Sequence, residues 1–248
     1  MFKRLFHWQI LFALILVALS AFFYFLHYLL FRDPHYLLNY FISNLAFLFL
    51  DVLIVMLVLQ GLLQYREKRA VLKKLNMVIG SFYIEVGTGL MKTLSGFAPD
   101  SSAHAALIIG ADWNDQDFAE TRKWFRENEV RLESRQGDLE QLKTFLQGKR
   151  SFLLNLLENG NLLEHESFTD LLWAIFHLTD ELAHRTDFRH LPEADFRHLT
   201  GDMQRAYGQL IREWLNFLKH LKQSYPYLYS LAIRTNPFDP HAAVEVQK

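Results

Sequence analysis

Residues 37–63 read LLNYFISNLAFLFLDVLIVMLVLQGLL, a run of 27 residues whose single charged side chain is Asp51. A helix needs about 20 apolar residues to cross the hydrocarbon core of a bilayer, so this run is long enough to span a membrane. Residues 8–31 form another apolar run, of 24 residues, whose few polar members include Ser20. The two runs predict a pair of transmembrane helices.

The first run also has features of a signal peptide. Lys3 and Arg4 precede it, and Ala18-Leu19-Ser20 has the small-x-small pattern of a cleavage site. The next residues, 21–26, read AFFYFL, whereas a mature chain normally begins with polar residues. We therefore predict an uncleaved transmembrane span.

The flanking charges predict the orientation of this hairpin. Residues 32–36 connect the runs with one charge of each sign and with Pro34, which blocks helix continuation. Basic residues instead gather at the outer ends of both runs, so the positive-inside rule places both termini in the cytoplasm, on a multi-pass protein of the cell inner (cytoplasmic) membrane. These topology-determining residues, which can also contact lipid headgroups, are Lys3, Arg4, Arg66, Lys68, Arg69, Lys73 and Lys74.

Asp51 lies near the centre of the second span, where an unpaired carboxylate is costly. Asn44, seven positions earlier, shares its helix face. One interpretation is that Asp51 joins helices through hydrogen bonds, with Ser20 at matching depth in the first span. The other is that Asp51 and Asn44 face the pore of an ion channel, which requires several copies because two spans cannot enclose a pathway.

Charge divides the chain into two parts. Residues 8–64 contain three charged side chains in 57, and residues 65–248 contain 48 in 184. This contrast, with a net charge of −1, excludes a simple soluble enzyme, a disordered chain and a nucleic-acid binder that relies on bulk basicity. The predicted domains are a transmembrane hairpin at 1–65 with spans at about 8–31 and 37–63, an amphipathic connecting helix at 66–97, a cytoplasmic helical domain at 98–236 and a disordered tail at 237–248.

The second part has the periodicity of helices. Apolar residues recur at intervals of three and four up to Phe97, and Gly80, Gly87 and Gly89 favour a bend or break there. We find no strand-like alternation, so the predicted fold class is all-α, a transmembrane hairpin followed by a helical bundle. Capping and breaking residues predict further helices at about 115–132, 138–158, 167–186, 192–224 and 226–234.

One polar cluster has the spacing of a metal site. His177, Glu181 and His184 lie on one side of a predicted helix, and Glu181-x-x-His184 is the ligand pair of helical di-metal carboxylate proteins. Such sites need a second Glu-x-x-His pair, which the sequence lacks. We therefore expect no metal and no other cofactor. The nearest substitutes are Asp187-x-x-His190 and Asp195-x-x-His198, with Glu85 and Glu164-His165-Glu166 as further acids.

Phosphate-loop, dinucleotide-binding, serine-elbow and His-Glu-x-x-His motifs are absent from the sequence, and it contains no cysteine. We therefore expect an interaction or sensing module rather than an enzyme, acting as a homo-oligomer. The alternatives are the oligomeric channel and, third, a metal-dependent helical enzyme or sensor. The expected partners are the lipid bilayer, further copies of the chain and a cytoplasmic protein, but not nucleic acid.

Several stretches resemble an uncharacterised group of prokaryotic two-pass membrane proteins. They are LLNLLEN at 153–159, EHESFTDLLWAIFHL at 164–178, YPYLYSLA at 225–232, RTNPF at 234–238, and the junction from QYREKR at 64–69 to EVGT at 85–88. The resemblance covers most of the chain and implies the same architecture. That group has no established activity, so the resemblance assigns no functional residue.

Overall fold

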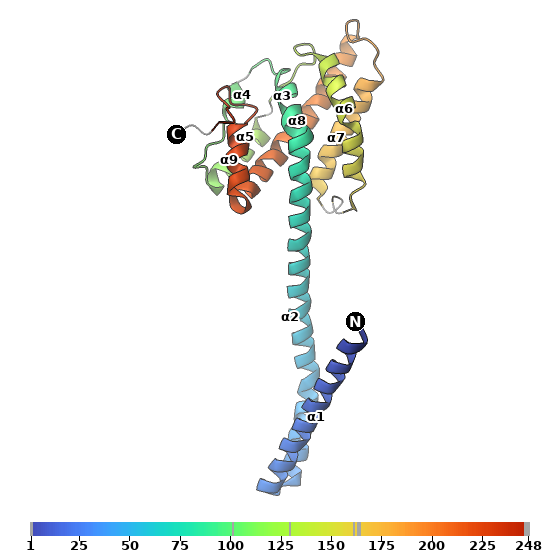
Figure 1. The fold of residues 1–248 in the computed structure, drawn as a ribbon, viewed down its shortest axis with the longest axis vertical. Coiled ribbons are helices and arrows are strands. Elements are labelled where there is room, and N and C mark those ends of the chain that lie inside the picture. Colours follow the sequence, from blue (N-terminus) through green and yellow to red (C-terminus); the bar gives the residue numbers. More distant parts are fainter. Residues whose placement is uncertain (1, 101, 129, 161, 163–164, 246–248) are drawn as a thin grey trace. The chain divides into compact units, whose positions relative to one another are not determined.

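Helices account for all the regular structure that is described in this protein. The computed structural model describes residues 2–100, 102–128, 130–160, 162 and 165–245. These residues contain no strand, which confirms the predicted all-α class (Figure 1). The elements are α1 (Phe2–Phe31), α2 (Pro34–Phe82), the π-helix η1 (Tyr83–Gly87), α3 (Thr88–Ser95), α4 (Ser102–Ala105), α5 (Asp115–Glu127), α6 (Leu139–Leu157), α7 (Glu166–Ala183), α8 (Glu193–Ser224) and α9 (Pro226–Arg234).

The chain divides into two units, Met1–Lys68 and Arg69–Lys248. In the first unit, α1 and the beginning of α2 run antiparallel as a helical hairpin (Figure 1). Phe12–Phe31 and Pro34–Glu67 are long and apolar enough to cross a membrane, and their side chains lie on the outside of the hairpin. The architecture of two apolar N-terminal helices followed by a helical domain is therefore confirmed.

A two-residue turn joins the helices of the hairpin. Arg32 has a φ of 50°, a left-handed conformation that reverses the chain directly after α1. The Asp33 carboxylate then accepts a hydrogen bond from the Tyr36 backbone N–H at 3.1 Å, which caps the first turn of α2. Pro34 occupies the first position of α2, where the missing N–H of proline costs nothing. The sequence between the two apolar runs thus specifies a tight reversal.

In the second unit, α8 is the helix around which the others pack. It contacts α3, α5, α7 and α9, and α7 in turn contacts α6 (Figure 1). One wide face of α8 is buried because its apolar residues recur with the period of a helix. The buried apolar side chains of α8 are Leu199, Met203, Ala206, Tyr207, Leu210, Ile211, Trp214, Leu215, Leu218 and Leu221.

The amphipathic helix expected to reach Phe97 is interrupted by the π-helix η1. The backbone N–H and the side-chain hydroxyl of Thr88 both bond to the carbonyl oxygen of Tyr83, which closes the wider π turn. Gly87 permits the turn, because a Cβ there would lie 2.4 Å from the Tyr83 ring. The Tyr83 hydroxyl donates to the Leu210 carbonyl oxygen at 2.9 Å, so η1 is fastened to α8.

Within residues 237–248, predicted to form a disordered tail, one side chain packs against the core. Phe238 is buried, with its ring stacked on His104 and edge-on to Trp214. Asn236 also donates from its side chain to the Leu107 carbonyl oxygen at 2.7 Å. One large apolar ring and one buried hydrogen bond therefore hold this segment against the core.

Candidate functional site

Two histidines and two carboxylates meet where α7 packs against α8. His177 and Glu181 lie one turn apart on α7, and His198 and Asp202 lie one turn apart on α8. Spacing of four residues puts both members of a pair on the same face of a helix, and the two faces are turned toward each other. The Nε2 atoms of His177 and His198 both lie 3.3 Å from Oδ2 of Asp202. We call these four residues the His–carboxylate cluster.

Asp202 is the buried member of the His–carboxylate cluster, with 3% of its side chain exposed. Its Oδ1 accepts a hydrogen bond from Arg205 at 3.1 Å. Its Oδ2 is buried and has no hydrogen-bond partner in the part of the chain that the structure describes. A buried carboxylate oxygen without a partner is costly, so Asp202 is the residue of the cluster that most needs a functional explanation.

Glu181 occupies the other side of the His–carboxylate cluster. Its Oε2 lies 3.5 Å from Nε2 of His198, and its Oε1 lies 3.9 Å from Nε2 of His177. Glu181 also receives a hydrogen bond from Arg185 at 2.7 Å. This bond, followed by the positive charges of Arg185 and His198, holds the pKa of the Glu181 carboxyl below its usual value against the opposing effect of burial. Glu181 is therefore a carboxylate at neutral pH.

The Glu181-x-x-His184 pair considered as a ligand pair from the sequence does not form in this structure. His184 is exposed and donates from Nδ1 to the carbonyl oxygen of Asp180 in its own helix, so it does not join Glu181. Asp195 bonds to Arg185, and His190 bonds to Asp187 at the surface, so neither Asp-x-x-His substitute supplies a second ligand pair. Glu164 lies outside the described residues.

Asp202 is the residue that the sequence analysis missed. The signal was His198-x-x-x-Asp202, a pair with the same spacing as His177-x-x-x-Glu181. Nothing local marks this pair, because its importance depends on α8 lying against α7. The sequence therefore identified His177, Glu181 and His198 as candidate ligands, but it did not show that they lie close together in the fold.

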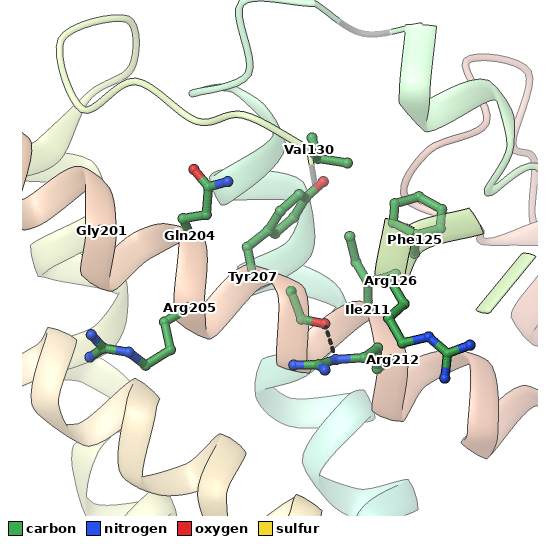
Figure 2. A pocket seen from close by; sticks show the side chains of 10 residues that line it. Phe125, Arg126, Val130, Gly201, Gln204, Arg205, Tyr207, Ile211 and Arg212 are labelled. Atoms are coloured by element: carbon green, nitrogen blue, oxygen red, sulfur yellow. Dashed lines mark hydrogen bonds between the residues drawn. The ribbon is translucent and has the colours of Figure 1, made fainter. Parts of the chain in front are cut away.

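A pocket with a different chemistry lies between α5 and α8. Its volume is about 550 Å³, and Phe125, Val130, Tyr207 and Ile211 supply apolar surface (Figure 2). The remaining lining residues are Arg126, Gly201, Gln204, Arg205, Gly208 and Arg212.

The three arginines of this pocket are arranged unequally. Figure 2 shows the side chain of Arg205 turned away from those of Arg126 and Arg212. Arg205 is paired with Asp202, whereas Arg212 donates only to the carbonyl oxygen of Gly208 among the hydrogen bonds described here. The guanidinium groups of Arg126 and Arg212 are exposed. The pocket therefore combines apolar surface with two exposed guanidinium groups.

The polar residues expected to act within the membrane lie on both helices of the hairpin, Ser20 on α1 and Asn44 and Asp51 on α2. The pairing of Ser20 with Asp51 stays a prediction. All three side chains are exposed.

The basic residues expected to set the topology are only partly described. Arg66 and Lys74 are exposed. The side chains of Lys3, Arg4, Lys68, Arg69 and Lys73 lie outside the described part of the structure.

The fold and the site define an all-helical protein with an N-terminal hairpin of two apolar helices and a separate helical domain. Residues 3–63 match the family model described as the N-terminal helical domain of MJ1433, and residues 71–234 match its C-terminal helical domain. The chain is 46% identical over 233 residues, or 94% of each chain, to the uncharacterized protein MJ1433 of Methanocaldococcus jannaschii.

The chain belongs to the MJ1433 family of helical proteins. This confirms the resemblance to a prokaryotic group without an established activity. No solved structure matches the chain significantly.

Proposed function

We propose that this chain is a membrane-anchored sensing module whose helical domain binds a small anionic ligand in the pocket between α5 and α8. One observation carries the proposal. Two exposed arginines, Arg126 and Arg212, and no acidic side chain line that pocket among the residues that the structure describes. The third arginine, Arg205, is paired with Asp202 instead. Guanidinium groups pair with phosphate and carboxylate groups through two parallel hydrogen bonds, so such a lining favours an anion.

The size and the apolar wall of the pocket narrow the class of ligand. A volume of about 550 Å³ is in the range of small-molecule sites, which favours a metabolite over a protein segment. Phe125 and Ile211 offer apolar contact, and Arg126 and Arg212 offer charge. A ligand with an organic ring and a phosphate or carboxylate group would use both parts. This arrangement supports sensing rather than binding of a cytoplasmic protein.

Membrane anchoring and self-association complete the proposal. The two apolar helices have the length and composition of membrane spans, and exposed Arg66 lies at the end of the second one. On this topology both termini are cytoplasmic, so the helical domain meets cytoplasmic ligands. Asp51 is exposed on the hairpin, and a carboxylate in a bilayer needs a polar partner. A second copy of the hairpin supplies one, which supports a homo-oligomer.

The anion pocket can be tested on the full chain in detergent micelles. We expect inorganic phosphate and ATP to raise the melting temperature, which tryptophan fluorescence measures. ATP should act at a lower concentration because its adenine ring also contacts the apolar side chains of the pocket. Arg126→Ala/Arg212→Ala should abolish the shift, and Arg189→Ala, an exposed arginine outside the pocket, should keep it. Equal shifts in the double variant and the wild type would refute the proposal, as would no shift with either anion.

A further inference from the structure

We propose that His177, His198 and Asp202 bind a divalent transition-metal ion between α7 and α8, with Glu181 as the fourth ligand. The site is distinct from the anion pocket and does not depend on the proposed sensing function. It also replaces the ligand pair Glu181-x-x-His184 that the sequence analysis considered.

Two of the distances between the ligand atoms are those of a tetrahedral metal site. Bonds from zinc to histidine nitrogen and carboxylate oxygen are about 2.0 Å long, which in a tetrahedron puts neighbouring ligand atoms roughly 3.3 Å apart. Oδ2 of Asp202 lies 3.3 Å from Nε2 of His177 and 3.3 Å from Nε2 of His198. One ligand atom from each of these three residues lies within 4.8 Å of the other two. A single ion can therefore reach all three atoms with small side-chain adjustments.

The unpartnered oxygen of Asp202 is an independent indication of a ligand. Both imidazoles approach Oδ2 closely, yet this oxygen receives no hydrogen bond within the described chain. That combination is expected when the ring nitrogens point at an ion between the ligands rather than at the neighbouring ligand itself. A metal ion would give the buried Oδ2 of Asp202 the partner that it lacks. An ordinary ion-pair network at the surface would not leave a buried oxygen in need of one.

Two arginines orient the carboxylates from behind. Arg205 donates to Oδ1 of Asp202 and leaves Oδ2 toward the histidines. Arg185 donates to Glu181, whose Oε2 also lies 3.5 Å from Nε2 of His198. Groups that hold the metal-binding side chains in place through hydrogen bonds in this way are typical of metal sites. Asp202 is 3% exposed and the histidines are about half exposed, so the site is anchored in the core and open to solvent.

The donor set selects the class of metal. Two imidazoles and two carboxylates suit zinc, iron and manganese, and the chain has no cysteine to favour softer ions. Bound there, an ion would link α7 to α8 beside the ion pair that Arg185, just after α7, makes with Asp195 of α8.

The test uses the full chain in detergent, stripped with chelator and then titrated with Zn²⁺ by calorimetry. We expect about one equivalent per chain, a higher melting temperature with zinc, and the visible absorption of tetrahedral Co²⁺ when cobalt replaces zinc. His177→Ala/His198→Ala should lose all three signals. Asp202→Asn should weaken binding while keeping the shape of the side chain.

His184→Ala/His190→Ala is the matched control, since it removes two exposed histidines from the same region. It should bind zinc as the wild type does. If the control loses zinc and the His177/His198 variant keeps it, the ligand assignment is wrong. If the stripped wild-type chain takes up neither zinc nor cobalt, the proposal is overturned whatever the variants do, so a variant that fails to fold does not protect it.

Discussion

Replacing Arg185 with methionine tests the ion pairs that link the end of α7 to α8. The Arg185 guanidinium donates two hydrogen bonds to the Asp195 carboxylate, at 2.8 and 2.6 Å, one to the Glu181 carboxylate at 2.7 Å, and one to the Glu181 carbonyl oxygen. Its side chain is 15% exposed, and those of Asp195 and Glu181 are 28% and 27% exposed. Methionine keeps the length and apolar contact of the stem and removes only the charge and the donors.

The geometry sets the size of the effect. Hydrogen bonds to charged groups contribute about 1.5–3 kcal/mol when buried, whereas exposed ion pairs contribute about 0–1 kcal/mol. Because these groups are partly exposed, we assign ~1 kcal/mol to each of the two pairs, or ~2 kcal/mol in total. For a domain of this size, that loss lowers the melting temperature by about 4–8 °C.

The pH dependence gives the prediction its second measurement. Hydrogen bonds from Arg185 are the largest cause of the lowered pKa values of Glu181 and Asp195 in the folded protein. Such groups stabilise the fold fully above their unfolded pKa of about 4, and that contribution is lost as the pH falls through the lower folded pKa. The difference between Arg185→Met and wild type should therefore be complete at neutral pH and shrink steadily in acid.

Thermal melts followed by tryptophan fluorescence, on the full chain in detergent, measure both quantities. Arg189→Met is the control, because Arg189 is an exposed arginine of the same α7–α8 turn. The reasoning fails if Arg185→Met has the same melting temperature as the wild type at neutral pH. It also fails if the difference persists undiminished in acid.

Three further predictions concern the hairpin and the independence of the helical domain. Reporter fusions after Lys248 and within residues 32–36 should report opposite sides of the membrane. A reporter after Lys248 that lies outside the cytoplasm would contradict the topology with both termini in the cytoplasm. Asp51→Leu should weaken self-association by about 1 kcal/mol per contact, whereas Asp51→Asn should preserve it. Sizing of both variants in detergent measures this difference, and unchanged assembly of Asp51→Leu would contradict the hypothesis that Asp51 joins helices. Residues 69–245 expressed alone should stay helical and melt cooperatively because they contain their own apolar core, and mostly coil by circular dichroism would show that they need the hairpin.

Helix boundaries were predictable where the signal is local. Asn114 caps α5 and Pro226 begins α9, as expected from residues adjacent in sequence, although α5 ends at Glu127 and not at about residue 132. The helix predicted at 167–186, with Ser167 as the expected cap, begins at Glu166 because His165 accepts the capping bond instead. Imidazole is an uncommon cap, so the usual preferences pointed to the serine.

Features that depend on distant contacts were not predictable in the same way. The π-helix η1 depends on the fit of Tyr83 beside Gly87 and on the bond from Tyr83 to Leu210, far along the chain. The His–carboxylate cluster depends likewise on the packing of α7 against α8, which brings Asp202 to His177. Helical periodicity predicts which residues share a face, but it does not predict which faces meet.

The two-residue turn of the hairpin has a consequence for how the protein enters a membrane. On the proposed topology, Arg32 and Asp33 are carried across the bilayer together, because the connection between α1 and α2 is too short for the helices to insert separately. Each charge at the centre of a bilayer costs roughly 2.5–3.5 kcal/mol, but adjacent opposite charges can cross as a neutral pair. A membrane voltage then does no net work on the turn. Insertion of this hairpin should therefore proceed equally well in energised and de-energised membranes.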